Sequence, residues 1–533
     1  MNGHRPAILK SMIRSGYQGY LHILFLLIFL LVVITPLTPL LFETIRFIAM
    51  DPMKAAGFAL PSGRALGLLV HSVILALAVS VSVTVIGVLA GTYLWNNSRG
   101  ITGYIPWALL VFVPLPSTLY YFAWSSFFPI TGWFSAWWVQ VMMYLPLLTV
   151  FAYIGLRLVE QEKIEAGRVA APDIQVYRRI VLPLAAPLVL AGSGLVFIFS
   201  MLDYTVPSLC SVNVYALEIF AQFSADNQAA HAFILAIPLM IIAGFGVYFS
   251  QYNMKKAFQN VSWDRADRVT GFRWPGWFNR LTQVAIGITV LGTCFVLVFL
   301  IGSAIAGQNV TITTAMYNDI LFSFTTALLA AGLCLAPAMA AAREMSRYHR
   351  WSGLWWGISM IPLAIPAALA GIGLLTIFNS PILEPVTGGV ILPVLVSIFR
   401  FIPIAAIVLC AQLRITDKTL IEAGQIFSTG IIREWTNIRL PLFFPGIFMS
   451  AYLVFAFTLG ELGGTIMVIP PGSSTLTIRL YNYLHYGASG SVAQLSLLLA
   501  GLVLLSGMVF LLVLRTLRRS HTHEHTNIRR GEN

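Results

Sequence analysis

Twelve long apolar segments constrain the fold of this 533-residue chain more than any other feature of its sequence. An α-helix needs about 20 mostly apolar residues to cross the roughly 30 Å hydrocarbon core of a membrane, and each segment is long enough. Backbone groups in lipid must bond to one another, and the alternating pattern of a β-barrel is absent, so each segment is predicted to be a helix. The segments cover residues 19–41, 65–93, 103–128, 132–156, 185–209, 230–252, 281–305, 317–342, 353–378, 388–413, 444–469 and 491–515.

The composition indicates an all-α integral membrane protein, since 58% of the residues are hydrophobic and only 10% are charged. The first apolar segment is too long for the core of a signal peptide, so we expect a retained anchor. The four cysteines are scattered without the spacing of a metal site, which predicts small packing residues. The His-containing tail from His521 to His525 is interpreted as a disordered polar end rather than a metal site. We therefore expect no metal, no other cofactor and no catalytic residue.

The formal net charge of +12 is an orientation signal rather than a sign of nucleic-acid binding. With the N-terminus inside, 27 of the 32 Lys and Arg fall on cytoplasmic segments, and Arg400 lies within a span. This distribution follows the positive-inside rule, and the reversed topology contradicts it. Both termini are therefore predicted to be cytoplasmic. The Lys and Arg expected outside are Arg46, Lys54, Arg64 and Arg479.

One cytoplasmic stretch occurs twice, at residues 165–183 and 422–441. Each copy opens with Glu-Ala-Gly, closes with Leu-Pro and lies between apolar segments. The opening glutamates are 257 positions apart (422 − 165), close to half the chain, which indicates an internal duplication. In the first copy the residues up to Ala171 are helical in composition, and Asp173 is placed to cap a second short helix. Short helices of this kind offer one face to a groove on a partner.

The duplication extends beyond the two stretches. Asp203 and Glu461 each lie twenty residues after the closing Leu-Pro, near the end of an apolar segment. Because each half has an even number of spans, both halves insert with the same orientation, as parallel repeats of six helices. Proline pairs in the third span of each half are predicted to loosen the helix there, at Pro114 with Pro116 and Pro362 with Pro366. The predicted units are a first half at 1–252, a cytoplasmic linker at 253–280, a second half at 281–515 and a cytoplasmic tail at 516–533.

The repeated stretch resembles the Glu-Ala-Ala loop of ABC importer permeases, which runs Glu-Ala-Ala, three residues, Gly, nine residues, Ile, any residue, Leu-Pro. Both copies carry Gly in place of the third Ala, Ala171 and Ser428 replace the central Gly, and the first copy closes one residue early. The residues 460–467 and 479–487 also resemble this family, in particular members that import ferric iron, thiamine, phosphonates, molybdate or polyamines. The matching loop positions are Glu165, Ala166, Gly167, Ile180, Leu182 and Pro183 in the first copy, and Glu422, Ala423, Gly424, Ile438, Leu440 and Pro441 in the second.

The resemblance implies a fused two-half permease of a type I importer in a bacterial inner membrane, surrounded by lipid. In this family each loop docks one ATP-binding subunit, so two copies of that subunit are expected, together with a periplasmic solute-binding protein. The chain contains no G-x-x-x-x-G-K-[ST] phosphate loop, so ATP must be bound by a separate polypeptide and the chain itself is not expected to be an enzyme. Outside the membrane, Arg479, His485 and Glu218 are candidate contacts for the binding protein, and a solvated loop is an equally economical interpretation.

Three charged residues are predicted within or at the ends of spans, namely Asp203, Arg400 and Glu461. A charge in a span is costly and usually faces a cavity or a partner charge. One hypothesis places the two acids near a pathway between the halves, with Arg400 as counter-ion or solute contact. The alternative is a fixed structural ion pair or an acid at the external interface.

Two questions remain open at the level of sequence. Ferric iron is the favoured solute, because fused permeases of this length are most familiar among ferric-iron and thiamine importers; thiamine, phosphonate, molybdate and polyamine are the alternatives. A rival class is an ion-coupled secondary transporter, in which the acids Asp203 and Glu461 would carry the coupling. That class leaves the twin loops unexplained. A membrane-embedded enzyme would need a metal or nucleophile cluster in the spans, and the sequence shows none.

Overall fold

The computed structural model describes residues 5–129, 131–259, 271–306, 313–347, 349–379, 388–416, 419–422, 431–486 and 489–531. All regular structure in these residues is helical, with no strand among them. The prediction of an all-α integral membrane protein is confirmed. Residues 260–270 of the predicted linker lie outside this part of the chain, and the predicted boundaries of the two halves stay predictions.

The described helices account for all twelve predicted spans. Nine helices are long and apolar enough to cross a membrane, and three further pairs pass the same test as bent spans. Two predicted spans, 185–209 and 444–469, are too long at their ends, because their helices stop at Leu202 and Leu459. The chain turns there at Asp203 and Gly460, for reasons described below.

The first half of the chain begins with a bent pair and ends with a long crossing helix. Its elements are α1 (Arg5–Ile34), α2 (Leu37–Met50), α3 (Pro52–Ala59), α4 (Gly63–Asn96), η1 (Gly100–Tyr104), α5 (Ile105–Phe112), α6 (Ser117–Phe127), α7 (Trp133–Arg157), α8 (Gln161–Ala170), α9 (Asp173–Val176), η2 (Tyr177–Val181), α10 (Leu182–Leu202), α11 (Thr205–Leu209), α12 (Tyr215–Asp226) and α13 (Ala229–Gln259).

The second half repeats this order. Its described elements are α14 (Gly276–Ala306), α15 (Thr314–Ser346), α16 (Ser352–Met360), η4 (Ile361–Ala364), α17 (Ala367–Phe378), α18 (Ile391–Ile415), α20 (Ile431–Glu434), η6 (Trp435–Arg439), α21 (Leu440–Leu459), α22 (Thr465–Val468), α23 (Leu476–Tyr486) and α24 (Ser489–Gly531). From the second short cytoplasmic helix to the crossing helix that follows it, the starts are offset by 258, as in α9 and α20 (431 − 173) and α10 and α21 (440 − 182). The opening glutamates are 257 apart, so one extra residue lies inside the second loop.

The predicted proline pairs produce the sharpest bends in the molecule's crossing segments. The α5–α6 pair bends by 104° at Pro114 and Pro116, and the pair formed by α16 with η4 and α17 bends by 93° before Ala367. Proline supplies no N–H and clashes with the preceding turn, so a helix breaks where two prolines follow closely. The bend in each half leaves a short stretch of non-helical backbone at mid-span, buried in protein rather than exposed to lipid.

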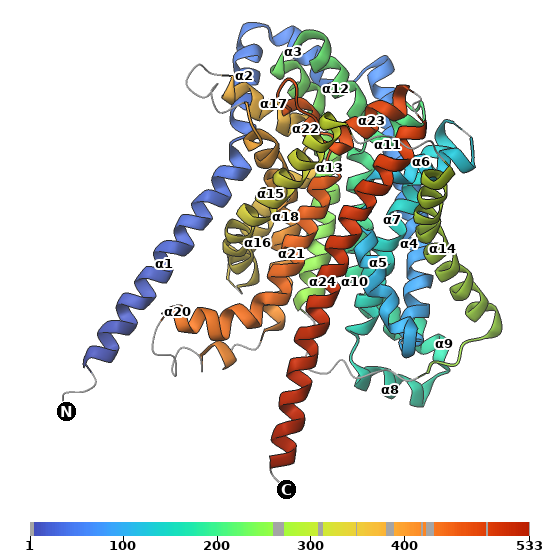
Figure 1. The fold of residues 1–533 in the computed structure, drawn as a ribbon, viewed down its shortest axis with the longest axis vertical. Coiled ribbons are helices and arrows are strands. Elements are labelled where there is room, and N and C mark those ends of the chain that lie inside the picture. Colours follow the sequence, from blue (N-terminus) through green and yellow to red (C-terminus); the bar gives the residue numbers. More distant parts are fainter. Residues whose placement is uncertain are drawn as a thin grey trace.

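Contacts fix the direction of each crossing. His71 of α4 contacts Trp133 at the start of α7, with ring centroids 5.1 Å apart, whereas Asn96 at the end of α4 contacts Phe272 near α9. The α5–α6 pair therefore carries the chain from one side to the other despite its bend. Figure 1 shows the consequence, with α8, α9, α20 and both termini at one end of the molecule and α3, α12, α17 and α23 at the other.

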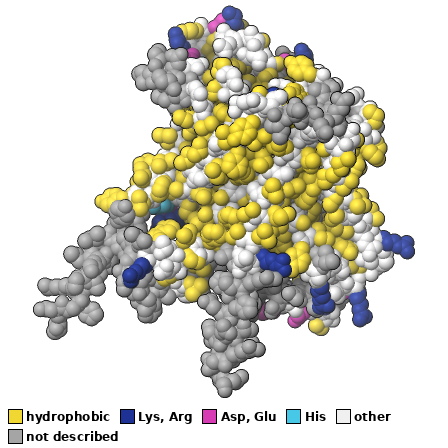
Figure 2. All heavy atoms as spheres, in the orientation of Figure 1, with side chains coloured by type: hydrophobic (Ala, Val, Ile, Leu, Met, Phe, Trp, Pro, Cys, Tyr) yellow, Lys and Arg dark blue, Asp and Glu magenta, His cyan; other side chains and the backbone are white. Residues whose placement is uncertain are grey.

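The two halves exchange their first helices. In the first half α4, α7 and α10 pack together, and α15, α18 and α21 form the equivalent group in the second half. The helix that opens the second half, α14, packs on α4 and α7, while α1 packs on α15 and α18. Large apolar side chains on these helices are exposed, as the broad yellow surface in Figure 2 shows, which suits contact with lipid.

Candidate functional site

The first repeated loop folds into an elbow made of α8, α9 and η2. The helix α8 ends at Ala170, the chain turns at Pro172, and α9 then runs without a break through η2 into the crossing helix α10. The segments α9, η2 and α10 form one continuous helical span from Asp173 to Leu202, so the second arm of the elbow joins the membrane helix without a loop.

The Leu-Pro ending explains the unusual turn inside this elbow. The segment η2 is a π-helical turn, and so is η6 at the equivalent place in the second half. Pro183 and Pro441 follow these turns directly. Proline has no N–H to donate to the carbonyl four residues earlier, and its ring clashes with that carbonyl. The wider π-helical turn makes room for the proline ring.

Gly167 lies in close packing within the first elbow. A Cβ atom at this position would lie 2.6 Å from Cδ1 of Ile180 and 3.1 Å from Cγ1 of Val176. Both side chains come from the segment that α8 packs against. The departure from the family's Ala at this position therefore has a local steric reason.

The remaining matched residues of the first elbow divide into an exposed and a packed group. Glu165 and Ala166 are exposed on α8, and Val169 on the same helix is 91% exposed. Ile180 and Leu182 are half-buried against the elbow, and Pro183 is exposed. The exposed face of α8 thus carries the apolar side chain of Val169 together with the Glu165 carboxylate.

Asp173 does not cap the second short helix as the sequence predicted. Pro172 holds the N-cap position, and the Asp173 carboxylate accepts hydrogen bonds from Arg168 Nε at 3.0 Å and from the backbone N–H of Arg273 at 2.6 Å. The Asp173 side chain therefore binds Arg168 and the Arg273 backbone instead of the free N–H groups at the start of its own helix. This arrangement ties α8 to the residues that precede α14.

The chain segment from Gly271 to Trp274 completes the first elbow. Asn96 holds Phe272 through both backbone groups, accepting from its N–H at 2.8 Å and donating to its carbonyl at 3.3 Å. The Arg168 guanidinium lies 4.2 Å from the centroid of the Phe272 ring. Trp274 lies edge-on to Tyr177 of η2, with centroids 5.3 Å apart. We call residues 271–274, in this position, the linker clasp.

The second elbow is described in part. Glu422 is exposed in a short helical segment, while Ala423 and Gly424 lie outside the described residues. Two closing positions match the first copy, since Ile438 is half-buried and Pro441 is exposed, whereas Leu440 is exposed where Leu182 is half-buried. At this elbow Glu434 is fully buried and forms an ion pair with Arg439 at 2.7 Å.

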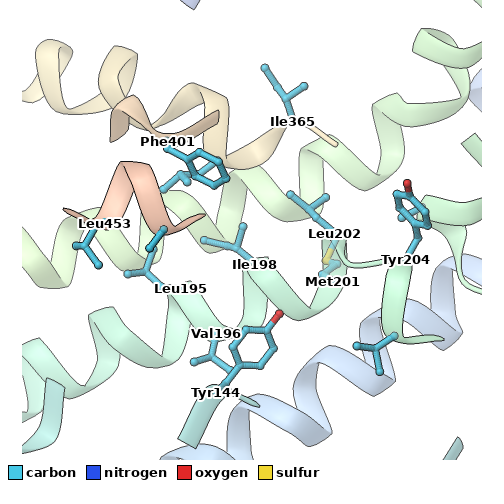
Figure 3. Close-up of a cluster of buried hydrophobic side chains, with 14 of the residues drawn as sticks. Tyr144, Leu195, Val196, Ile198, Met201, Leu202, Tyr204, Ile365, Phe401 and Leu453 are labelled. Carbon is cyan, nitrogen blue, oxygen red and sulfur yellow. The ribbon is translucent and has the colours of Figure 1, made fainter. Parts of the chain in front are cut away.

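The three predicted charges come together at one cavity between the halves. The cavity has a volume of about 160 Å³, and Asp203, Arg400 and Glu461 all line it. Each half contributes its proline bend, one face of the helix α7 or α18, and the far end of α10 or α21. Figure 3 shows apolar lining residues from both halves in one buried cluster, among them Tyr144, Leu202, Tyr204, Ile365 and Phe401.

The two acids occupy equivalent positions, 258 residues apart (461 − 203), and both cap a short helix. Asp203 accepts hydrogen bonds from the Thr205 N–H at 2.8 Å and from Gln140 Nε2 at 3.0 Å. Glu461 accepts from the N–H groups of Gly464 at 2.9 Å and Thr465 at 2.8 Å. Carboxylates in this position satisfy the free N–H groups of a helix start, which is why the crossing helices stop where they do.

Arg400 extends from α18 toward Glu461 and is partly exposed to the cavity. Its Nε lies 3.7 Å from Glu461 Oε1, and the Arg400 side chain is 32% exposed while that of Glu461 is 1% exposed. Before the loops the two halves are offset by 257 residues, so the repeat-equivalent of Arg400 is Met143 (400 − 257), and this charge breaks the symmetry of the cavity.

Sequence reasoning missed three polar residues at this cavity. Gln140 is fully buried and holds Asp203, and Tyr144 and Tyr204 line the cavity. A glutamine within an apolar segment is a signal that could have identified Gln140. The two tyrosines carry no such signal, because the chain contains 19 tyrosines and many lie in spans.

Two residues that were candidate contacts for a binding protein, Arg479 and Glu218, are paired within the chain. Arg479 forms an ion pair with Asp319, and this hydrogen bond raises the pKa of the Arg479 guanidinium above its ordinary value. Glu218 lies 3.3 Å from Arg64. A binding-protein contact through Arg479 or Glu218 would have to compete with these partners.

The curated proteins that are similar to this chain are transport permeases, although no family model matches it. The putrescine transport system permease protein PotI of Escherichia coli (strain K12) is 25% identical over 222 residues, which are 41% of this chain and 79% of the relative. A putative 2-aminoethylphosphonate transport system permease protein, PhnV of Salmonella paratyphi A, is 26% identical over 195 residues, 36% of this chain and 72% of the relative. The Fe(3+)-transport system permease protein FbpB 2 of Haemophilus influenzae is 21% identical over 384 residues, 70% of this chain and 73% of the relative.

The helical multi-pass fold, the repeated elbow and the cavity between the halves suit a membrane transport protein. The relatives are permease proteins of transport systems, one of them a probable ABC transporter permease, so this chain is similar to ABC transporter permeases. The alignment with FbpB 2 extends over most of both chains, as a permease with two fused halves requires.

Proposed function

We propose that the chain moves a small solute inward across a bacterial inner membrane, driven by two separate ATP-binding subunits that dock on the two elbows. A periplasmic binding protein delivers the solute to the opposite face. The excess of Lys and Arg on the segments at the elbow end supports a cytoplasmic location for the elbows and for both termini.

One observation carries the proposal: each elbow and each cavity acid lie at opposite ends of the same helix. The first elbow continues into α10, which ends beside Asp203, and the second continues into α21, which ends beside Glu461. At 1.5 Å per residue these helices are about 30 Å long, enough to reach from one membrane face to the cavity. A displacement of α8 by an ATPase subunit would be passed to this continuous helix through the packing of Gly167 on Val176 and Ile180, and from there to the cavity.

Ferric iron is the solute that we favour. The support is the alignment with FbpB 2, which extends over 70% of this chain, whereas the matches to PotI and PhnV cover 41% and 36%. Putrescine-like polyamines, phosphonates, thiamine and molybdate are the alternatives within the same class.

Co-purification tests the proposal. The detergent-solubilised chain is isolated from its host beside the double variant Glu165→Lys/Glu422→Lys, whose two changes lie on exposed positions. We expect an ATPase subunit with the wild type and none with the double variant. If the wild type retains no ATPase under conditions that preserve other importers, the proposal fails.

The acids at the cavity favour one rival, an ion-coupled secondary transporter. The lone chain reconstituted in liposomes separates the two. Uptake driven by an ion gradient in the absence of any ATPase would support the rival and contradict our proposal.

A further inference from the structure

The two carboxylates at the central cavity are already occupied by the protein. Glu461 is 4% exposed and both of its oxygens accept backbone N–H groups, and each oxygen of Asp203 likewise has a donor within 3.0 Å. A cation entering the cavity would have to compete with these hydrogen bonds, which hold the ends of α10 and α21 in place. The acids are therefore poor contacts for a solute.

The donors at the same cavity are not occupied in this way. Within the described residues the only charged partner of Arg400 is Glu461, at 3.7 Å, beyond hydrogen-bonding distance. The Tyr204 side chain is 94% buried (6% exposed), yet its hydroxyl group has no hydrogen-bond partner. Tyr144 of α7 lines the same cavity.

An unpartnered buried hydroxyl costs free energy unless a ligand satisfies it. A guanidinium group presents its N–H donors in a planar fork that matches a carboxylate or a phosphonate. Arg400 and Tyr204 both line this cavity and carry donors that the protein leaves without a close hydrogen-bond acceptor, whereas the two acids already accept hydrogen bonds. The bonding capacity that remains at the cavity therefore suits an anion.

We propose that the cavity binds the transported solute through an oxyanion group, held by Arg400 and by the hydroxyl group of Tyr204. This proposal rests on the proposed function, because it names the chemistry of the solute in the pathway. It favours solutes that carry a phosphonate, phosphate or carboxylate over bare cations and polyamines. Ferric iron would then cross as a complex with an oxyanion ligand.

Binding of defined probes to the full chain in lipid nanodiscs tests the proposal. The probes are inorganic phosphate, 2-aminoethylphosphonate, citrate and putrescine, and the readout is the shift of the thermal unfolding midpoint with probe concentration. We expect at least one oxyanion probe to stabilise the wild type and putrescine to leave the midpoint unchanged. Stabilisation by putrescine alone, or by none of the probes, overturns the proposal.

Two variants separate a solute contact from a structural role. Arg400→Gln should weaken oxyanion binding about tenfold or more, since hydrogen bonds to charged groups are the strong ones. Tyr204→Phe removes a hydroxyl group that has no partner, so the empty chain should unfold at the same temperature or higher, while oxyanion binding weakens roughly threefold to tenfold. Equal binding by Tyr204→Phe and wild type would overturn the assignment of Tyr204.

Tyr120→Phe is the matched control. The Tyr120 hydroxyl is also buried without a partner, but the residue does not line the cavity. We expect unchanged oxyanion binding in this variant, and a loss equal to that of Tyr204→Phe would contradict the proposal. Co-purification of the ATPase is measured on the same preparations, so a failure of the oxyanion site with ATPase retained is distinguishable from a failure of the importer assignment.

Discussion

The two elbows fill the same buried position with different side chains, an apolar pair in the first elbow and an ion pair in the second. Counting back 258 residues from Glu434 and Arg439 gives Val176 and Val181 in the first elbow. The valines are 1% and 0% exposed, and Glu434 is fully buried against Arg439. Both pairs are five residues apart across a π-helical turn, where residues i and i+5 face each other. A duplicated fold has thus kept the contact while exchanging an apolar pair for a buried ion pair.

The elbows also differ in what braces them. The linker clasp holds the first elbow through Asn96, Arg168 and Asp173, and it belongs to the chain segment that leads into α14. Because α14 packs on α4 and α7, the opening helix of the second half is part of the helix group of the first half. The first elbow is thus braced by the segment that leads into the second half.

The largest effect should come from breaking the ion pair of the second elbow. Arg439→Val removes the cation from a buried carboxylate and should cost about 3 kcal/mol of unfolding free energy. The double variant Glu434→Val/Arg439→Val copies the first elbow and should lie within about 1 kcal/mol of the wild type, because a buried ion pair is often replaceable by apolar side chains. Denaturant unfolding in detergent measures both.

If the double variant is as unstable as the single variant, the equivalence between the two pairs is wrong. If the single variant is as stable as the wild type, the ion pair contributes nothing at this elbow.

A smaller effect is expected from opening the linker clasp. Asn96→Ala removes both side-chain hydrogen bonds to the backbone of Phe272 and should weaken the clasp by about 1–2 kcal/mol. Faster hydrogen exchange and proteolysis at residues 271–274 report this change. Asn97→Ala is the control, because the Asn97 side chain binds the carbonyl of Tyr93 and not the clasp. Equal release of the clasp in both variants would contradict the bracing role.

The smallest effect concerns Gly167. The new methyl group of Gly167→Ala would overpack against Ile180, which lowers the free energy of unfolding by about 1–3 kcal/mol. The higher helix propensity of Ala raises it by about 1 kcal/mol, so the variant should be slightly less stable than the wild type. Ile180→Val removes the Cδ1 atom that the new methyl group would meet. The double variant should therefore unfold at a higher temperature than Gly167→Ala alone. Simple addition of the two single effects would show that the steric reason is wrong.

The sequence predicted the features that repeat at long range. Twelve apolar segments, two Leu-Pro endings and the twin acids all depend on residue type and spacing, and the structure places each on a helix, an elbow or the cavity. Even the proline bends follow from the chemistry of a single residue type.

Features that depend on contacts between distant segments could not be predicted. Asp173 has the right type and place for a helix cap, but Arg168 and the backbone of Arg273, a hundred residues away, bind it instead. The predicted spans overran Leu202 and Leu459 because apolar residues continue past the capped turns. The roles of Tyr204 and Gln140 depend on the cavity, which forms only when both halves pack together. The docking role of the twelve matched loop residues stays a prediction.

The count of ATPase subunits bound to one chain tests the central claim most directly. Native mass measurement of the purified complex is made for the wild type, for Glu165→Lys, for Glu422→Lys and for the double variant. Our account predicts two ATPase subunits on the wild type, one on each single variant and none on the double variant. Two subunits retained on the double variant, or both lost after one single change, would contradict two independent docking elbows.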